Sequence, residues 1–365
     1  MTPVRHAGAP ALLALVVRAG SACTPTPAGD PPGEGLEAGP DCVEDGDWPV
    51  DEAANVLGAR VVAGVADEDD LAALRIVVDG LRERRGPWAH HVEGPWREAA
   101  GGTFVAEGAE SLAYASVPEG VVDDEGRPWL FFVDGDLDAM MAKAEAGEPM
   151  RAGWGGVAGL AAARWSEDGT WERVEVEVVG DDVPLLIVDP DILRLPDGSW
   201  RMYTLSVPAD EACADRVNPA GMPAPHRVWA YRSDDLVEWT SIGTVYEASE
   251  RTTDPGVWCR GDTCGLMVSA GTTPPEAALS ADGGRSFVAS PVEVPEGSLG
   301  MPDFLVREDR ETWMISQTDG QALRALSSTD GRVWVEDTGP GLAGEGPTVI
   351  EHDGDVLLWI HVSSW

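Results

Sequence analysis

Two carboxylates stand directly before a proline and a third stands two residues before one, and together they could perform acid/base chemistry. The segments are Asp189-Pro190-Asp191, Thr253-Asp254-Pro255 and Glu345-Gly346-Pro347. Carboxyl groups that share a site raise one another's pKa, because neighbouring like charges resist ionisation. Acid/base catalysis near neutral pH depends on pKa values separated in this way. Asp189, Asp254 and Glu345 are therefore our candidate catalytic residues, on condition that the fold brings them together.

These prolines belong to a set of five, and each precedes a pair of apolar segments. The five are Pro118, Pro190, Pro255, Pro302 and Pro347. Proline is tolerated at the first residue of a strand, where no N–H is needed for the ladder, so we expect each one to open an innermost strand. The segments that follow are rich in β-branched and aromatic residues, which is typical of strands. We predict second strands at 127–133, 200–205, 265–269, 312–316 and 355–362.

A further motif recurs downstream of four of these strands: a Ser, an acidic turn and an aromatic residue. The four copies lie at 166–171, 233–239, 280–287 and 328–334. Asp and Gly close hairpins, because Asp bonds neighbouring N–H groups and Gly adopts positive φ. We expect the aromatic side chains to pack between adjacent sheets. The motif is therefore interpreted as scaffold, and its recurrence indicates a propeller or a solenoid.

These repeats predict an all-β fold, a five-bladed β-propeller over 51–365. The predicted blades are at about 111–180, 181–247, 248–294, 295–340 and 341–365. The last unit stops after its second strand, so we expect an N-terminal segment within 51–110 to close the ring. The favoured donor is a strand at 71–80. The alternative is an amphipathic helix at 68–85, whose apolar positions would be Leu71, Leu74, Val78 and Leu81.

The N-terminus has the pattern of an export signal. Arg5 precedes a short apolar stretch at 9–17, so residues 1–22 are predicted to be a signal peptide. Cys23 is a candidate lipidation site, which would make the protein a lipoprotein of the cell surface or periplasm; ordinary secretion is the alternative. Residues 23–50 are acidic and rich in Pro and Gly, which is typical of a flexible tether.

The remaining cysteines are consistent with an exported protein. Cys259 and Cys264 flank a predicted hairpin, across which we expect a disulfide, and Cys42 with Cys213 would then pair by exclusion. Zinc is the alternative use of such cysteines, but no His stands at ligand spacing from them, so we predict no metal site of this kind.

The chain carries 64 acidic against 25 basic residues and a formal net charge of −39. Without a basic stripe to displace counterions, nucleic acid and anionic lipid are disfavoured as partners. We expect contact with a membrane only through a lipid anchor, and a monomer.

Residues 189–203 and 233–239 resemble the five-bladed propeller glycosidases, namely family 43 arabinanases and xylosidases with the related levansucrases and invertases. The resemblance covers about 110–365. It implies a carbohydrate partner, with Asp189 as general base, Asp254 as the residue that tunes its pKa, and Glu345 as general acid. Val117 and Met301 depart from the family pattern of carboxylates. No cofactor is expected, and a structural calcium ion in the channel is left open.

Three further residues are candidates for substrate binding. Asp191 and Asp303 follow two of the five prolines, and Trp154 lies in a long loop where it could either stack on a sugar or pack on a neighbouring blade. Two functions stay open at this point. One is a surface-anchored glycoside hydrolase that acts through the carboxylates at the channel mouth, and the other is a non-catalytic propeller that binds carbohydrate or protein.

Overall fold

The structure is a computed structural model of the 365-residue chain. It describes residues 68–85, 90–99, 103–106, 112–113, 115–134, 141–142, 145–146, 159–180, 183–184, 186–207, 227–248, 253–269, 275–296, 300–307, 312–318, 322–337 and 339–363.

The described strands form five antiparallel sheets, each built mainly from consecutive strands. The first contains β4 (Ala115–Val122), β5 (Pro128–Asp134), β6 (Gly159–Trp165) and β7 (Trp171–Val174). The second contains β9 (Leu186–Arg194), β10 (Trp200–Val207), β11 (Arg227–Ser233) and β12 (Glu238–Glu247), with β8 (Glu177–Val179) added in parallel to β12. The third contains β13 (Thr253–Arg260), β14 (Thr263–Ser269), β15 (Glu276–Ser280) and β16 (Val288–Ala289). The fourth contains β17 (Gly300–Val306), β18 (Thr312–Gln317), β19 (Leu323–Ser328) and β20 (Val335–Glu336). The fifth contains β21 (Glu345–His352) and β22 (Asp355–Ser363) from the end of the chain.

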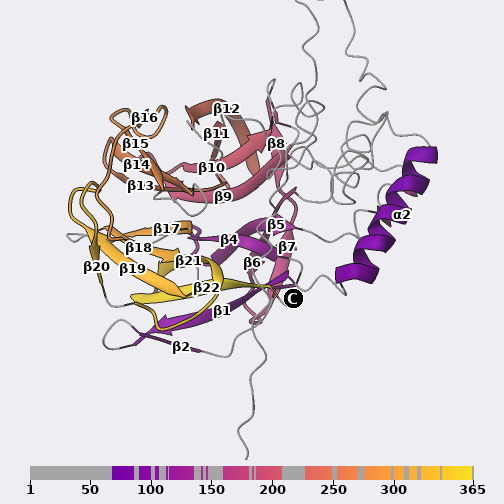
Figure 1. Ribbon diagram of the computed structural model, residues 1–365, viewed down its shortest axis with the longest axis horizontal. Helices are drawn as coiled ribbons and strands as arrows, with labels where there is room; N and C mark the ends of the chain where they lie inside the picture. Colours follow the sequence, from indigo (N-terminus) through magenta and orange to yellow (C-terminus); the bar gives the residue numbers. More distant parts are fainter. Residues whose placement is uncertain are drawn as a thin grey trace, which may run out of the picture. The chain divides into compact units, whose positions relative to one another are not determined.

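The first strands of the five sheets form a closed ring. β4 contacts β9, β9 contacts β13, β13 contacts β17, β17 contacts β21, and β21 returns to β4. Figure 1 shows these strands toward the middle of the ring, with outer strands such as β2, β16 and β20 at the periphery. The fold is a five-bladed β-propeller, as predicted, and each of the five predicted second strands is present.

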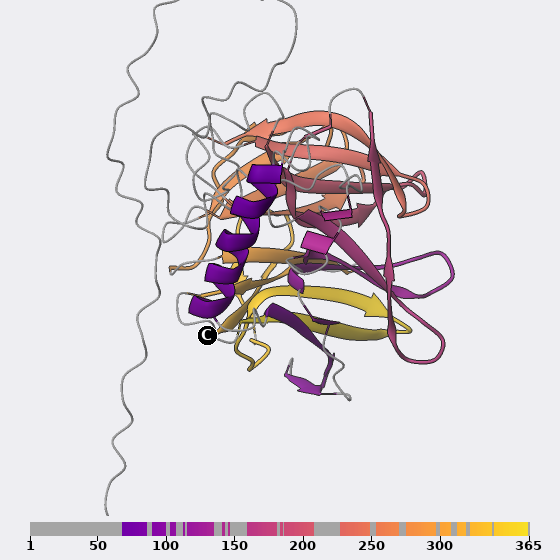
Figure 2. The same ribbon diagram turned by 90° about the vertical axis from the view of Figure 1, so that its right-hand side faces the viewer.

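The fifth blade is closed by a different segment from the favoured one. β1 (His90–Glu98) pairs antiparallel with β22, and β2 (Phe104–Ala106) and β3 (Leu112–Ala113) pair with β1. Figure 2 shows indigo β1 beside yellow β22, so that residues 90–98 and 355–363 lie in one sheet. The predicted donor strand at 71–80 is wrong, because these residues lie in helix α2 (Glu68–Arg85). Their apolar residues recur with helical spacing, and the first turn carries three acids, which favours a helix N-terminus.

The five prolines lie inside the innermost strands rather than at their starts, which corrects the prediction. Pro118, for example, is the fourth residue of β4. The ladder shifts register around each proline, as between Ser116 and Glu119 in β4. Such an irregularity accommodates proline, because the interrupted ladder needs no N–H at that point.

The aromatic residue of each repeated turn packs against the blade that precedes it around the ring. Trp239 meets Phe131 edge-on, with ring centroids 5.7 Å apart. Phe287 meets Tyr203 in the same way, at 5.8 Å. Trp171 meets Trp359 at 6.2 Å, across the junction between the first and last blades. Trp334 belongs to the same apolar cluster as Trp258 of the third blade. These contacts confirm the predicted role of the aromatic residues between sheets.

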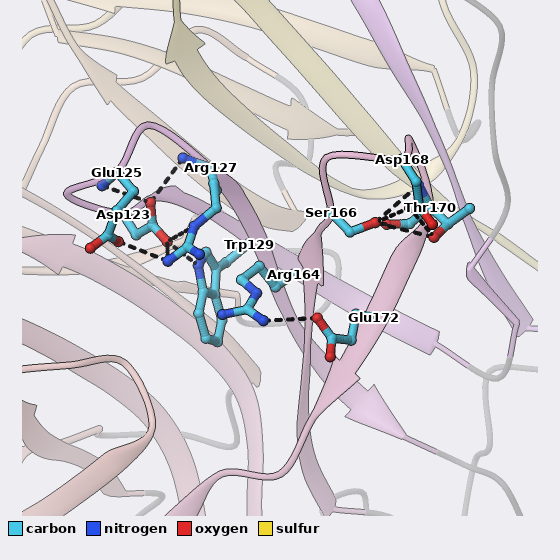
Figure 3. A network of polar contacts seen from close by, with 9 residues as sticks. All are labelled: Asp123, Glu125, Arg127, Trp129, Arg164, Ser166, Asp168, Thr170 and Glu172. Atoms are coloured by element: carbon cyan, nitrogen blue, oxygen red, sulfur yellow. Dashed lines mark hydrogen bonds and ion pairs between the residues drawn. The ribbon is translucent and has the colours of Figure 1, made fainter.

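The polar residues of the same turns form hydrogen bonds within the turn. Ser328 Oγ donates to Asp330 Oδ1 at 3.1 Å, while Gly331 N donates to Ser328 Oγ at 2.8 Å. Figure 3 shows the first copy, in which the Ser166 and Thr170 hydroxyls lie around the Asp168 carboxylate. The same view shows the 123–127 hairpin, where Asp123 Oδ2 accepts the indole N–H of Trp129 at 2.8 Å. The motif is therefore part of the scaffold.

Candidate active site in the channel

The residues directly before the five prolines form one ring, which we call the pre-proline ring. All five have left-handed backbones, with φ between 44° and 53°: Val117, Asp189, Asp254, Met301 and Gly346. This conformation is uncommon for non-glycine residues and least favourable for a β-branched one such as Val117. Its repetition at five equivalent positions shows that each bulge imposes it. All five line a cavity of about 20 Å³ together with the five prolines.

Asp189 and Asp254 come together in this ring, as the sequence predicted. Asp254 is buried and Asp189 is partly exposed. Burial and the neighbouring charge of Asp254 raise the pKa of Asp189 well above its usual value, although the backbone N–H of Asp254 donates to the Asp189 carboxyl. Burial raises the pKa of Asp254 to about 6. The pair can therefore hold a proton at a pH where an exposed Asp is ionised.

Glu345 lies one position earlier in its strand than the two aspartates in theirs. The residue before Pro347 is Gly346, so Gly346 completes the pre-proline ring. Glu345 is opposite His361 in the β21–β22 ladder, and its Oε2 lies 3.5 Å from His361 Nδ1. Its side chain is partly exposed, and Glu345 is not among the residues that line the cavity with Asp189 and Asp254.

The residues directly after the five prolines form a second ring, the post-proline ring. Its members are Glu119, Asp191, Gly256, Asp303 and Thr348. The three acids are buried, with 6%, 4% and 5% of their surfaces exposed, and one ligand oxygen from each lies within 4.8 Å of the others. Asp191 and Asp303 were predicted to bind substrate, whereas Glu119 was missed. Its position after Pro118, equivalent to that of Asp191, was the signal that could have identified it.

The side chains of the post-proline ring link neighbouring blades at four of the five junctions. Glu119 Oε1 accepts Ile192 N at 3.1 Å, and Asp191 Oδ2 accepts Val257 N at 3.1 Å. Two more bonds of the same type run from Val349 N to Asp303 Oδ2 at 2.5 Å and from Gly120 N to Thr348 Oγ1 at 2.7 Å. Gly256 has no side chain for this bond, and Phe304 N instead donates to Asp303 Oδ1 at 2.6 Å. The ring is thus connected at four of its five junctions.

Burial and mutual repulsion dominate the electrostatics of the post-proline ring. The pKa of Glu119 is raised well above its usual value by burial and by the charges of Asp303 and Asp191. Burial and the charge of Asp303 likewise raise the pKa of Asp191. Burial raises the pKa of Asp303 to about 7.

A wider cavity of about 340 Å³ continues the channel beyond the three acids. Glu119, Asp191 and Asp303 line both this cavity and the small one, so they lie at the constriction between them. Apolar residues such as Trp200 and Trp258 line the wide cavity together with Glu351 and the three acids. Arg194 also lines it, but its guanidinium pairs with Asp124.

Several sequence predictions lie outside the described residues: the signal peptide, the tether, Cys23, Cys42, Cys213 and Trp154. Cys259 and Cys264 face each other across β13 and β14, with sulfurs 1.99 Å apart. Among the residues that the structure describes, no helix combines the length and hydrophobicity of a membrane span.

Comparison with known proteins gives structural likenesses at low identity. No family model and no curated protein matches the sequence. A family 117 glycoside hydrolase of Zobellia galactanivorans is 13% identical, with TM-score 0.47 over 68% of this chain and 84% of that one. An endo-arabinase of Bacteroides thetaiotaomicron is 12% identical, with TM-score 0.47 over 69% and 94%. A Bacillus subtilis arabinanase is 11% identical, with TM-score 0.43 over 68% and 94%.

Proposed function

We propose that the protein is a glycoside hydrolase that acts on a poly- or oligosaccharide at the pre-proline end of its channel. Asp189 would be the general base, Asp254 the residue that tunes its pKa, and Glu345 the general acid. The observation that supports this most is the Asp189–Asp254 pair, since two interacting carboxyls share one cavity and one of them is partly exposed.

The proposed roles follow from the environment of each group. A carboxylate with a raised pKa is a stronger proton acceptor, which suits Asp189 as a base that activates water. Glu345 is partly exposed and has an imidazole close by, which can orient its carboxyl toward a leaving oxygen. Hydrolysis would then need one proton from Glu345 and one proton taken by Asp189 on the opposite side of the scissile bond.

The test is turnover of a panel of aryl glycosides and of plant and microbial polysaccharides. Asp189→Asn should lower turnover by about 10²–10⁴-fold, the usual contribution of a general acid or base. Asp353→Asn is the matched control, because Asp353 shares the left-handed backbone (φ 53°) but lies on an exposed turn. Wild-type turnover in Asp189→Asn would refute the assignment of the base.

A non-catalytic carbohydrate-binding propeller is the second candidate. Val117, Met301 and Gly346 occupy three of the five pre-proline positions, and the cavity of about 20 Å³ holds roughly one water molecule. Saturable retention on an immobilised polysaccharide, without turnover of any substrate in the panel, would favour this function over hydrolysis.

We also propose that the protein is exported, with Cys23 as a lipid anchor. The Cys259–Cys264 pair supports export, because disulfides persist in oxidising compartments, whereas the anchor rests on the position of Cys23 after the predicted signal peptide. Metabolic labelling with a fatty acid, compared between wild type and Cys23→Ser, tests the anchor. Unlabelled wild type that is recovered from the medium would favour ordinary secretion.

A further inference from the structure

Beyond the proposed hydrolase site, the constriction of the channel holds three buried carboxylates, and Arg194 is the one basic residue among the described residues that line the two cavities. Glu119, Asp191 and Asp303 come from β4, β9 and β17, which belong to the first, second and fourth blades. Arg194, which lines the same wide cavity, is already paired with Asp124 and lies over the Trp200 ring. Buried charges are usually paired or coordinate a metal, because their desolvation is costly.

The second observation is an unsatisfied oxygen within this cluster. Asp191 is 4% exposed, and its Oδ2 accepts Val257 N. Its other oxygen, Oδ1, is buried and has no hydrogen-bond partner among the described residues. A buried polar atom left without a partner is costly in a folded protein, which suggests that a ligand supplies the missing interaction.

The ligand set suits a hard divalent cation. Calcium takes 6–8 oxygen ligands at roughly 2.3–2.6 Å, so two oxygens bound to one ion lie at most about 5 Å apart. The three carboxylates present oxygens within 4.8 Å of one another. The adjoining cavity of about 340 Å³ gives access and room for the waters that would complete the coordination shell.

We propose that Glu119, Asp191 and Asp303 bind one calcium-like divalent cation, which clamps the first, second and fourth blades together at the channel axis. The ion supplies positive charge to three carboxylates that already accept N–H groups of the second, third and fifth blades. The ion therefore reinforces the post-proline ring, where hydrogen bonds already join the blades. It takes no part in the reaction proposed for the pre-proline ring.

The experiment is a titration of chelator-treated full-length protein with terbium chloride, followed by competition with calcium chloride. Trp200 and Trp258 line the cavity, so an ion at the cluster should give tryptophan-sensitised terbium emission. Moderate salt is included to suppress loose binding to the strongly acidic surface. We expect one saturable site in the wild type, at least about tenfold weaker binding in Asp191→Asn and in Asp303→Asn, and unchanged binding in the surface control Asp353→Asn.

A second measurement does not depend on emission. Calcium chloride should raise the thermal unfolding midpoint of the wild type, because a ligand that binds the native state stabilises it. The midpoints of Asp191→Asn and Asp303→Asn should not respond. The asparagine amide keeps an acceptor for the neighbouring N–H, so both variants should fold; Glu119→Gln is a third variant of the same kind.

Two results would overturn the site. One is the absence of saturable binding in the wild type, and the other is wild-type affinity in both Asp191→Asn and Asp303→Asn. Either result leaves the hydrolase proposal intact, since that proposal rests on Asp189, Asp254 and Glu345. Conversely, loss of turnover in Asp189→Asn with unchanged terbium binding would show that the pre-proline ring and the post-proline ring have independent roles.

Discussion

The backbone N–H of Val257 donates to Oδ2 of Asp191 at 3.1 Å, and this bond joins the second blade to the third. Equivalent bonds involve Glu119, Asp303 and Thr348. Asp191 and Asp303, which the sequence suggested as substrate-binding residues, thus join neighbouring blades in the ring. The catalysis that we propose is assigned to the pre-proline ring, where Asp189 is partly exposed.

Thr348→Val should weaken the junction between the last and first blades. The substitution keeps the shape but removes the hydroxyl that accepts Gly120 N, so a buried N–H is left unpaired. We expect a loss of about 1–3 kcal/mol in the free energy of unfolding, measured with urea. Thr348→Ser keeps the oxygen and is the control. Equal losses in the two variants would contradict a role for this hydrogen bond.

When a chelator is present to keep the proposed cation site empty, the free energy of unfolding should fall as the pH rises through about 6. Asp254 has a pKa of about 6 in the folded protein and about 3.9 when unfolded, so the folded state binds its proton more tightly. The contribution of this proton to the free energy of unfolding is fully present below about pH 3.9 and is lost as pH rises through about 6. Urea unfolding between about pH 5 and 7.5 measures the slope, which Asp254→Asn should reduce because the amide does not titrate. Asp303, with a pKa of about 7, should leave a residual slope in that variant. Identical slopes in both proteins would refute this account.

Gly256→Ala should destabilise the contact between the third and fourth blades. A Cβ on Gly256 would lie 2.4 Å from the Pro302 carbonyl oxygen and 2.8 Å from the Phe304 ring, and the backbone oxygen cannot rotate away. Overpacking of this kind costs about 1–3 kcal/mol. Gly300→Ala is the matched control, because its Cβ would meet nothing within 4 Å, and we expect a change within about 0.5 kcal/mol. Equal thermal unfolding midpoints for Gly256→Ala and Gly300→Ala would contradict this prediction, because the contact between the third and fourth blades would then have accommodated the methyl group.

Asp235→Ala should reduce stability without changing turnover or carbohydrate binding. Asp235 Oδ1 accepts Val237 N and Glu238 N, both at 2.9 Å, and Ser233 Oγ at 3.1 Å. Loss of this acceptor should cost about 1–2 kcal/mol. Asp234→Ala, next to it and 83% exposed, should change stability by less than about 0.5 kcal/mol. A change in turnover or binding in Asp235→Ala, with the fold intact, would contradict the scaffold role of the turn.

The sequence by itself determined the number of blades and the place of their inner strands. The five prolines and the four Ser-Asp-aromatic turns are local signals, because turn chemistry and strand composition act over a few residues. For the same reason the second strands, such as β10 and β14, appear where they were predicted. The pairing of Asp189 with Asp254 was also predictable, since equivalent positions in successive blades are neighbours in a ring.

Only the tertiary structure decided which segment closes the ring and which carboxylates meet. β1 pairs with β22 across more than 250 positions in the sequence, so no local pattern shows that this segment is the one that closes the ring. The bulge at each proline turns the residue after it toward the axis, so Glu119 joins Asp191 and Asp303, while Gly346 takes the ring position before Pro347 and leaves Glu345 beside His361. Such assignments depend on register, and a shift of one residue changes the direction of every side chain in a strand.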